Sequence, residues 1–254
     1  MTQHLWIGTS WKMNKMRAEA QAFARGLAAS NVVTTVGCQA FVIPPFPYIA
    51  DVAKILAGTG VKVGAQNMHW AERGAWTGEV SPLMVKDCGA TLVEIGHSER
   101  RAYFGETDET VALKTQAALK HGLTALVCIG DTKAEYEAGR TVEALERQVW
   151  GLLKYVAKDA VGKVIIAYEP VWSIGESGIP ATPEFANEQH IRIAAVVKDL
   201  TGSTLPILYG GGVNPQNCVA LASQSHIHGL FIGRWGWDVE GYIGIIKSVM
   251  EALR

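Results

Sequence analysis

The stretch Val164-Ile165-Ile166-Ala167-Tyr168-Glu169-Pro170 joins an apolar run to a single carboxylate and a proline. An uninterrupted apolar run of this length is typical of a buried strand, and this one ends abruptly at Glu169. A glycine-containing segment follows, and helical periodicity resumes near Pro183. We interpret the stretch as a strand with an acid at its C-terminal end, followed by a flap.

Glu169 has two interpretations at this point. If the flap closes over the carboxyl group, burial would raise its pKa and let it act as a general base near neutral pH. In an open and hydrated site, it would be an ordinary carboxylate that caps the next turn or pairs with a neighbouring cation. The stretch alone does not decide between the two.

The alternation of an apolar run and a following segment occurs eight times along the chain. The apolar runs predict strands at residues 5–8, 40–43, 61–65, 91–95, 124–129, 164–168, 205–209 and 229–233. Helical spacing predicts helices at residues 15–29, 46–56, 107–121, 131–156, 183–200 and 239–253. Because the runs are apolar throughout, they predict a parallel sheet that is buried on both faces.

Eight such units in 254 residues match the (β/α)₈ barrel, whose usual length is about 250 residues. A doubly wound open sheet is the alternative, but it gives no reason for the count to stop at eight. The sequence contains no linker or low-complexity tract. We therefore predict an α/β fold with one (β/α)₈ barrel domain over residues 1–254.

Composition and charge narrow the class of ligand. The hydrophobic content of 48% is sufficient for a full core, and the formal net charge is −1. This charge gives no long-range attraction for nucleic acid or an anionic membrane, so an anion must be bound by a local site. A small phosphorylated ligand is compatible with such a site.

The cysteines and the N-terminal sequence indicate the cellular compartment in which we expect the protein. The four cysteines are far apart, with no metal or redox spacing: Cys38, Cys88, Cys128 and Cys218. They predict free thiols in a reducing compartment, by default the cytoplasm. The N-terminus has no signal-peptide pattern, and no apolar run approaches the ~20 residues that span a bilayer, so we expect a soluble, unprocessed protein.

The polar residues that follow the strands are few, and in a barrel the loops after the strands build the site. They are Ser10 and Lys12, His97, Glu169, Gly211 and Gly212, and Gly233 and Arg234, after strands one, four, six, seven and eight. Singly, each has a structural explanation. Together they give one face a base, an imidazole, a cation and a glycine loop whose N–H groups can hold a phosphate.

Four blocks that contain these residues resemble the triosephosphate isomerase family. They are Ser10-Trp11-Lys12-Met13-Asn14, residues 96–101 (Gly-His-Ser-Glu-Arg-Arg), residues 167–172 with 174–175 around Glu169, and residues 209–211 with 213–215 around the glycine loop. The match runs from Trp6 to about Gly233. The resemblance implies a TIM barrel and a cofactor-free isomerisation of a small sugar phosphate through an enediol(ate).

The resemblance also implies a role for each matched residue. Glu169 would carry the proton between neighbouring carbons. His97, kept neutral by a short helix that begins at Ser98, would donate a hydrogen bond to the developing enolate oxygen. Lys12 would place positive charge over the substrate and its phosphate, and Glu99 would help to order Lys12. The backbone of Gly175, Gly212 and Gly233 would bind the phosphate, while closure of residues 170–181 would exclude water.

Residues 66–81 form an excursion that is too long for an ordinary βα loop. It resembles the dimer loop of the family, in which Thr77 would reach the partner's site near its His97. A flexible surface loop is the alternative, but it fits badly with Met68, Trp70 and Trp76, which are costly to leave exposed. We predict a homodimer.

Five departures from the family pattern surround the pocket. Ser10 replaces asparagine, Glu176 occupies the flap tip, Ile179-Pro180-Ala181 replaces Lys-Thr-Ala, Gly212 replaces serine, and Arg234 replaces glycine. Ser10 would open space near the reacting carbons. Arg234 would pair with the phosphate or with Glu176, and Pro180 would stiffen the flap's C-terminal hinge.

Residues 7–15, 66–71 and 231–234 are similar to the erythritol-pathway branch of this family. This resemblance implies a four-carbon substrate, with L-erythrulose 1-phosphate converted to D-erythrulose 4-phosphate. The alternative within the family is the interconversion of D-glyceraldehyde 3-phosphate and dihydroxyacetone phosphate, as in glycolysis and gluconeogenesis.

Two further classes stay open: a silent barrel that binds a phosphosugar, and an aldolase-type barrel with Lys12 as a Schiff base. We expect no Schiff base, because Lys12 lies among polar groups rather than in an apolar pocket. We also expect no metal and no cofactor, since the histidines lack ligand spacing with acids and the enediol route needs no ion.

Overall fold

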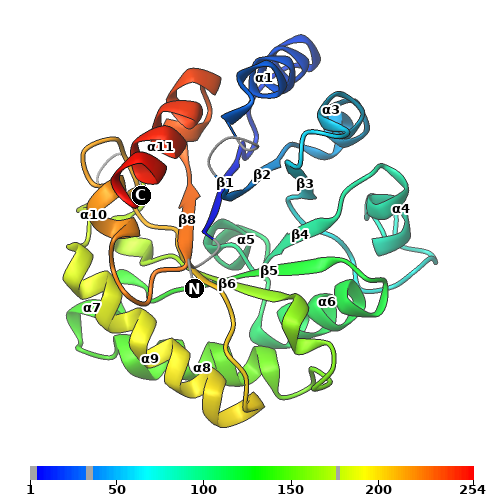
Figure 1. Cartoon of the computed structure of the whole chain (residues 1–254). Coiled ribbons are helices and arrows are strands. Elements are labelled where there is room, and N and C mark those ends of the chain that lie inside the picture. The colour runs from blue at the N-terminus through cyan, green and yellow to red at the C-terminus, as the bar shows by residue number, and fades with distance from the viewer. Residues whose placement is uncertain (1–4, 33–36, 176–177) are drawn as a thin grey trace.

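Eight parallel strands close into a barrel in a computed structural model that describes residues 5–32, 37–175 and 178–254 (Figure 1). The strands are β1 (Trp6–Ser10), β2 (Gln39–Ile43), β3 (Lys62–Ala65), β4 (Leu92–Ile95), β5 (Thr124–Ile129), β6 (Val164–Tyr168), β7 (Ile207–Tyr209) and β8 (Gly229–Ile232). Each strand pairs with its sequence neighbours, and β8 pairs with β1 to close the ring. The predicted barrel is confirmed.

Helices lie around the outside of the strands (Figure 1). They are α1 (Arg17–Ser30), α3 (Ile49–Leu56), α4 (Pro82–Asp87), α5 (Ser98–Tyr103), α6 (Asp108–Lys120), α7 (Lys133–Glu137), α8 (Thr141–Leu153), α9 (Pro183–Thr201), α10 (Cys218–Ala222) and α11 (Val239–Ala252). Short 3₁₀ turns lie at Phe46–Tyr48, Val161–Lys163, Val171–Ser173 and Arg234–Gly236. None of the helices in the described ranges has the length and apolar character needed to cross a membrane.

Two differences from the predicted helices have local causes. Helices α4 and α10 were not predicted, since six or five residues are too few to display a 3.6-residue period. The single helical segment predicted at residues 131–156 is divided into α7 and α8. The break contains Gly139 at φ +68°, a left-handed conformation that ends a helix.

Strand alternation divides the core into two clusters. Side chains such as Phe41, Leu92 and Leu126 fill the barrel interior, while a larger set lies between the strands and the helices. Gly8 of β1 leaves room for this interior packing, because a Cβ there would lie 2.1 Å from the Phe41 ring. Towards the C-terminal ends of the strands, the inward positions become polar, beginning with Ser10 and Glu94.

The start of the flap is anchored by Asp131, a fully buried carboxylate just after β5. Its oxygens accept hydrogen bonds from the Tyr168 hydroxyl (3.1 Å), the Thr141 hydroxyl (2.7 Å) and Nε1 of Trp172 (3.1 Å). Trp172 also stacks on Tyr136 at a ring distance of 4.1 Å. These contacts fix the position of the chain directly after Glu169.

We expect Asp131→Ala to lower the free energy of unfolding by about 3 kcal/mol or more, because two buried donors and one partly buried donor lose their acceptor at once. Urea denaturation would measure this loss. Asp199→Ala, on the exposed side of α9, is the control and should change stability by less than about 0.5 kcal/mol. An equal, small effect in both variants would contradict the anchoring role.

Candidate active site

The predicted polar residues meet at the C-terminal end of the barrel. Ser10, Lys12, His97 and Glu169 line one small pocket there. It adjoins a cavity of about 350 Å³ whose wall includes Lys12, and the glycines after β7 and β8 contribute to both. The structure thus brings together the carboxylate, the imidazole and the cation that the sequence places after different strands.

Lys12 follows β1 with a left-handed φ of +52°. Its Nζ lies 2.7 Å from Oε1 of Glu99, as the sequence analysis predicted for a partner that orders the lysine. Burial lowers the pKa of Lys12, but the hydrogen bond and charge of Glu99, together with the charges of Glu169 and Glu94, outweigh this effect, so the pKa lies above its usual value. The ammonium group is therefore charged at neutral pH.

His97 caps the N-terminus of α5, the short helix predicted to begin at Ser98. Its Nδ1 accepts a hydrogen bond from the backbone N–H of Glu99 at 3.2 Å. A nitrogen that accepts carries no proton, so the proton of a neutral imidazole lies on Nε2. This Nε2 faces Oε1 of Glu169 at 3.6 Å.

Glu169 lies directly after β6 and is only 3% exposed. Its Oε2 is buried and has no hydrogen-bond partner among the described residues. The carboxylate passes close to Gly210, where a Cβ would lie 2.9 Å from Cγ of Glu169. Burial of a carboxylate oxygen without a protein partner is costly, and it leaves that oxygen available to a substrate proton.

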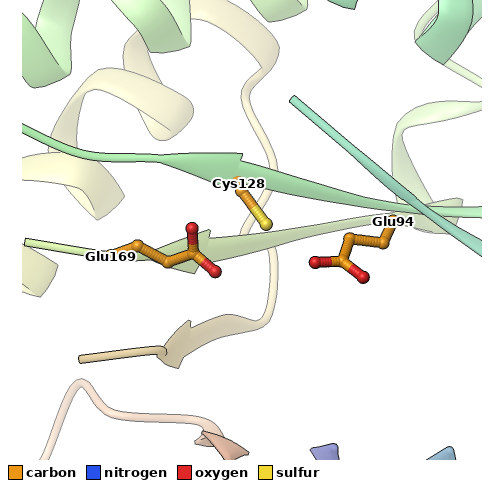
Figure 2. Close-up of side chains that lie close together, drawn as sticks. All are labelled: Glu94, Cys128 and Glu169. Atoms are coloured by element: carbon orange, nitrogen blue, oxygen red, sulfur yellow. The ribbon is translucent and has the colours of Figure 1, made fainter. Parts of the chain in front are cut away.

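Glu94 is a second buried carboxylate in the site, and the sequence analysis did not identify it. Its Oε2 accepts a 2.8 Å hydrogen bond from the Ser10 hydroxyl, and its Oε1 lies 4.0 Å from Nε2 of His97. Figure 2 shows Glu94 and Glu169 pointing toward one another with Cys128 between them. The sequence does contain one sign of it, because Glu94 is the one charged residue in the run predicted as the fourth strand, residues 91–95.

Burial raises the pKa of Glu94 to about 7. The charge of Glu169 adds to this effect, while His97 and the Ser10 hydroxyl oppose it. Because the pKa of an unfolded glutamate is about 4.3, the folded state binds the proton more tightly. The stability that this proton provides is complete below about pH 4 and is lost as the pH rises through 7.

We therefore expect Glu94→Gln to gain stability over the natural chain as the pH rises from 4 to 8. The gain in the free energy of unfolding is on the order of 3 kcal/mol, since each unit of pKa shift corresponds to about 1.4 kcal/mol. Urea denaturation of both proteins across this range measures the difference, and titrations common to both cancel. A difference that stays constant with pH would contradict the raised pKa.

Glu94, Cys128 and Glu169 also form a group, within the described ranges, whose ligand atoms all lie within 4.8 Å of one another. In geometry these atoms could meet on one metal ion. Burial and the two nearby carboxylates raise the pKa of the Cys128 thiol well above its usual value. Without a metal ion, the thiol of Cys128 therefore stays protonated at neutral pH.

The glycines predicted to contact phosphate line the larger cavity. Gly175 has φ +92°, a conformation that favours glycine, and Gly233 directly precedes Arg234 at the start of a 3₁₀ turn. Gly212 lies against the flap, because a Cβ there would be 3.1 Å from the Ser173 carbonyl oxygen and 3.8 Å from Pro180. The predicted partner of Arg234 in the flap, Glu176, lies outside the described residues.

The sequence matches the family described as "Triosephosphate isomerase" over residues 5–249. The chain belongs to the triosephosphate isomerase family. Three proteins called L-erythrulose-1-phosphate isomerase are close relatives within it. Those of Rhizobium rhizogenes, Rhizobium meliloti and Mesorhizobium japonicum are 54%, 55% and 52% identical, over 98% of this chain and 96%, 98% and 98% of theirs.

Two departures from the triosephosphate isomerase pattern now have a structural explanation. Ser10, where asparagine was expected, donates to Glu94 and thereby holds a second carboxylate beside His97. Gly212, where serine was expected, gives the flap room to approach, because a side chain would crowd Ser173. Both changes lie on the walls of the same cavity system.

The residues 66–81 excursion carries exposed and stacked aromatic groups. The His69 ring contacts both Trp70, at 4.1 Å between ring centroids, and Trp76, at 4.4 Å, and Trp76 is 50% exposed. Thr77 is exposed in the single chain. The excursion begins beside the Lys12 loop, since the Gln66 side chain donates to the Lys12 carbonyl at 2.8 Å.

Proposed function

We propose that this protein converts L-erythrulose 1-phosphate to D-erythrulose 4-phosphate through an enediol(ate). The single observation that carries the proposal is the facing pair of Glu169 and His97, with Oε1 and Nε2 separated by 3.6 Å in a buried pocket beside charged Lys12. The names of the relatives, at 52–55% identity over nearly the whole chain, support the four-carbon substrate.

The reaction moves a carbonyl group by one carbon. In L-erythrulose 1-phosphate, Glu169 removes the proton from C3, the released electron pair forms the C2=C3 bond, and the carbonyl oxygen on C2 becomes an enolate. Nε2–H of His97 donates a hydrogen bond to this developing negative charge. Glu169 then returns the proton to C2, while the proton of the C3 hydroxyl passes through Nε2 of His97 to the C2 oxygen, which leaves the ketone at C3 and a hydroxyl group at C2.

The other residues bind and enclose the substrate. Lys12 supplies positive charge toward the phosphate and the enolate, and Glu99 holds its Nζ in place. Backbone N–H groups of Gly175, Gly212 and Gly233 are the proposed phosphate donors. Closure of residues 170–181 would keep the labile intermediate away from water.

A panel of three- and four-carbon ketose and aldose phosphates tests this function. We expect the highest kcat/KM for L-erythrulose 1-phosphate, with solvent deuterium incorporated at the reacting carbons. Much faster turnover of D-glyceraldehyde 3-phosphate would instead identify a triose-phosphate isomerase. Absence of deuterium exchange would favour a silent binding barrel.

An aldolase-type mechanism would require Lys12 to form a Schiff base with the substrate. Lys12 would have to be neutral to form a Schiff base, yet its pKa is raised by the contact with Glu99. We therefore expect no adduct after borohydride treatment in the presence of substrate. A trapped covalent adduct on Lys12 would overturn the enediol mechanism.

We also propose that the protein is a cytoplasmic homodimer. The four cysteines are free thiols, which supports a reducing compartment. Met13, at 96% exposure beside the excursion, and Trp76 are large apolar groups that a partner subunit would cover. Thr77 would then reach into the partner's site.

Sedimentation should give twice the 27.4 kDa chain mass. We expect Thr77→Arg to shift the protein toward the monomer and to lower kcat at least ~10-fold, since a buried, unpaired charge disfavours a tight interface. Ser223→Arg, at the end of α10, is the control for an added exposed charge. A monomeric natural chain would contradict the dimer, whatever the variants do.

A further inference from the structure

The proposed substrate differs from a triose phosphate by one group. L-erythrulose 1-phosphate carries an extra hydroxymethyl group on the reacting carbon that is farther from the phosphate. If the phosphate binds at Gly212 and Gly233, this group must lie at the opposite, inner end of the pocket. The inference that follows rests on the proposed function and concerns the residue that recognises this terminal hydroxyl.

At this end, one residue of the pocket wall, Ser10, contacts a buried carboxylate that lies behind the wall. Ser10 lines the pocket from β1, and Glu94 of β4 lies directly behind it, joined by a 2.8 Å hydrogen bond. The other carboxylate oxygen of Glu94 lies 4.0 Å from Nε2 of His97, the atom that faces the reacting carbons. A hydroxyl group one carbon beyond those carbons would therefore lie within reach of Glu94.

A structural role does not explain this carboxylate. Glu94 is 2% exposed, and the inward position before it in the same strand is occupied by Leu92. Ser10 supplies a hydrogen bond to only one of the two oxygens, and the 4.0 Å separation from His97 exceeds hydrogen-bond distance. A buried carboxylate that is only partly satisfied costs stability, and such groups concentrate at functional sites.

We propose that Glu94, oriented by Ser10, determines substrate specificity by accepting a hydrogen bond from the terminal hydroxyl group of the four-carbon ketose phosphate. Figure 2 shows the arrangement that this role requires, with the Glu94 carboxylate pointing inward and the Glu169 carboxylate facing it from the other side. Glu94 recognises the group that a triose phosphate lacks, whereas Glu169 and His97 act on the carbons that both substrates share.

The test compares the two substrate lengths in one protein. Kinetics at pH 8 give kcat/KM for L-erythrulose 1-phosphate, and dihydroxyacetone phosphate, used as a competitive inhibitor, gives Ki for the three-carbon chain. For Glu94→Leu we expect kcat/KM to fall roughly 10- to 100-fold, the range for loss of a hydrogen bond to a charged group, while Ki changes less than about threefold. Glu94→Gln should be intermediate, since its amide oxygen still accepts.

A second variant and a matched control keep the test decisive. Ser10→Ala leaves the carboxylate in place but frees its orientation, and we expect a loss of about 3- to 10-fold for the four-carbon substrate alone. Glu106→Gln removes a different buried carboxylate, one that pairs with Lys114 outside the pocket, and should change both substrates equally. These comparisons do not depend on any single variant folding well.

The outcomes separate the inference from the function on which it rests. Equal losses for both chain lengths in the Glu94 variants, or no loss for either, would overturn the specificity role while leaving the isomerase intact. If the natural protein does not turn over L-erythrulose 1-phosphate, the proposed function fails first, before any variant is compared, and the specificity role fails with it.

Discussion

We expect Glu169→Gln to lower kcat for L-erythrulose 1-phosphate by at least ~10²-fold, the usual lower bound for loss of a placed general base. The amide keeps the shape of the side chain at the end of β6 but cannot accept the proton from C3. Binding of the phosphate should change little, because Glu169 lies at the reacting carbons rather than among the glycines of the larger cavity. The effect should therefore appear in kcat and not in the affinity for inorganic phosphate.

Steady-state kinetics with inorganic phosphate as a competitive inhibitor measure both quantities. Glu143→Gln, an exposed acid on α8, is the control for the loss of one carboxylate charge. Turnover by Glu169→Gln within a few-fold of the natural enzyme would remove Glu169 from its role as the base. Glu94 would then be the next candidate for the base, because one of its carboxylate oxygens lies within 4.8 Å of a carboxylate oxygen of Glu169.

The strands were predictable because each is a short, local apolar run that needs no knowledge of its partners. The predicted runs at residues 124–129 and 164–168 coincide with β5 and β6. The loop positions of His97 and Glu169 follow from the same pattern, since a parallel barrel brings every residue after a strand to one end. The sequence pattern does not give distances between residues. The separation of 3.6 Å between Nε2 of His97 and Oε1 of Glu169 is therefore known only from the structure.

Glu94 illustrates why part of the site could not be predicted. Local apolarity predicts a strand over its segment, and a single charge inside an apolar run does not by itself indicate a site. Its hydrogen-bond partner, Ser10, lies 84 positions earlier in the chain, and only closure of the barrel brings these two side chains of β1 and β4 into contact. The importance of Ser10 was recognised from a family resemblance, but the physical reason for a serine is the carboxylate it contacts.

The flap is likewise held in place by a residue that is distant in the sequence. The sequence predicts a flap after Glu169, and in the structure this segment starts with a 3₁₀ turn, Val171–Ser173, which forms its N-terminal hinge. The group that holds the hinge is Asp131, which lies 41 positions away from Trp172 and has no local signal beyond being an acid after a strand. Buried acids near strand ends thus have three different roles in one barrel: the proposed base Glu169, the proposed specificity group Glu94, and the anchor Asp131.

We expect Lys12→Met to reduce kcat/KM by ~10²- to 10³-fold. Unlike Glu169→Gln, which should lower kcat, this variant should act by raising KM. Methionine keeps the length of the side chain but removes the positive charge from the wall shared by the pocket and the phosphate cavity. The lost terms are a charge-assisted hydrogen bond, worth about 1.5–3 kcal/mol, and further attraction to the phosphate and the enolate. KM and the inhibition constant for inorganic phosphate should therefore rise together, in contrast to Glu169→Gln.

Fold stability should change little in Lys12→Met, because its partner Glu99 is 46% exposed and remains hydrated when unpaired. Lys133→Met, at 76% exposure on α7, is the matched control for removal of one lysine charge. If Lys12→Met lowers kcat but leaves the affinity for inorganic phosphate unchanged, Lys12 acts on the reacting carbons alone. Binding of the phosphate would then come from the backbone donors of the glycine loops, and the proposed role of Lys12 in phosphate binding would be wrong.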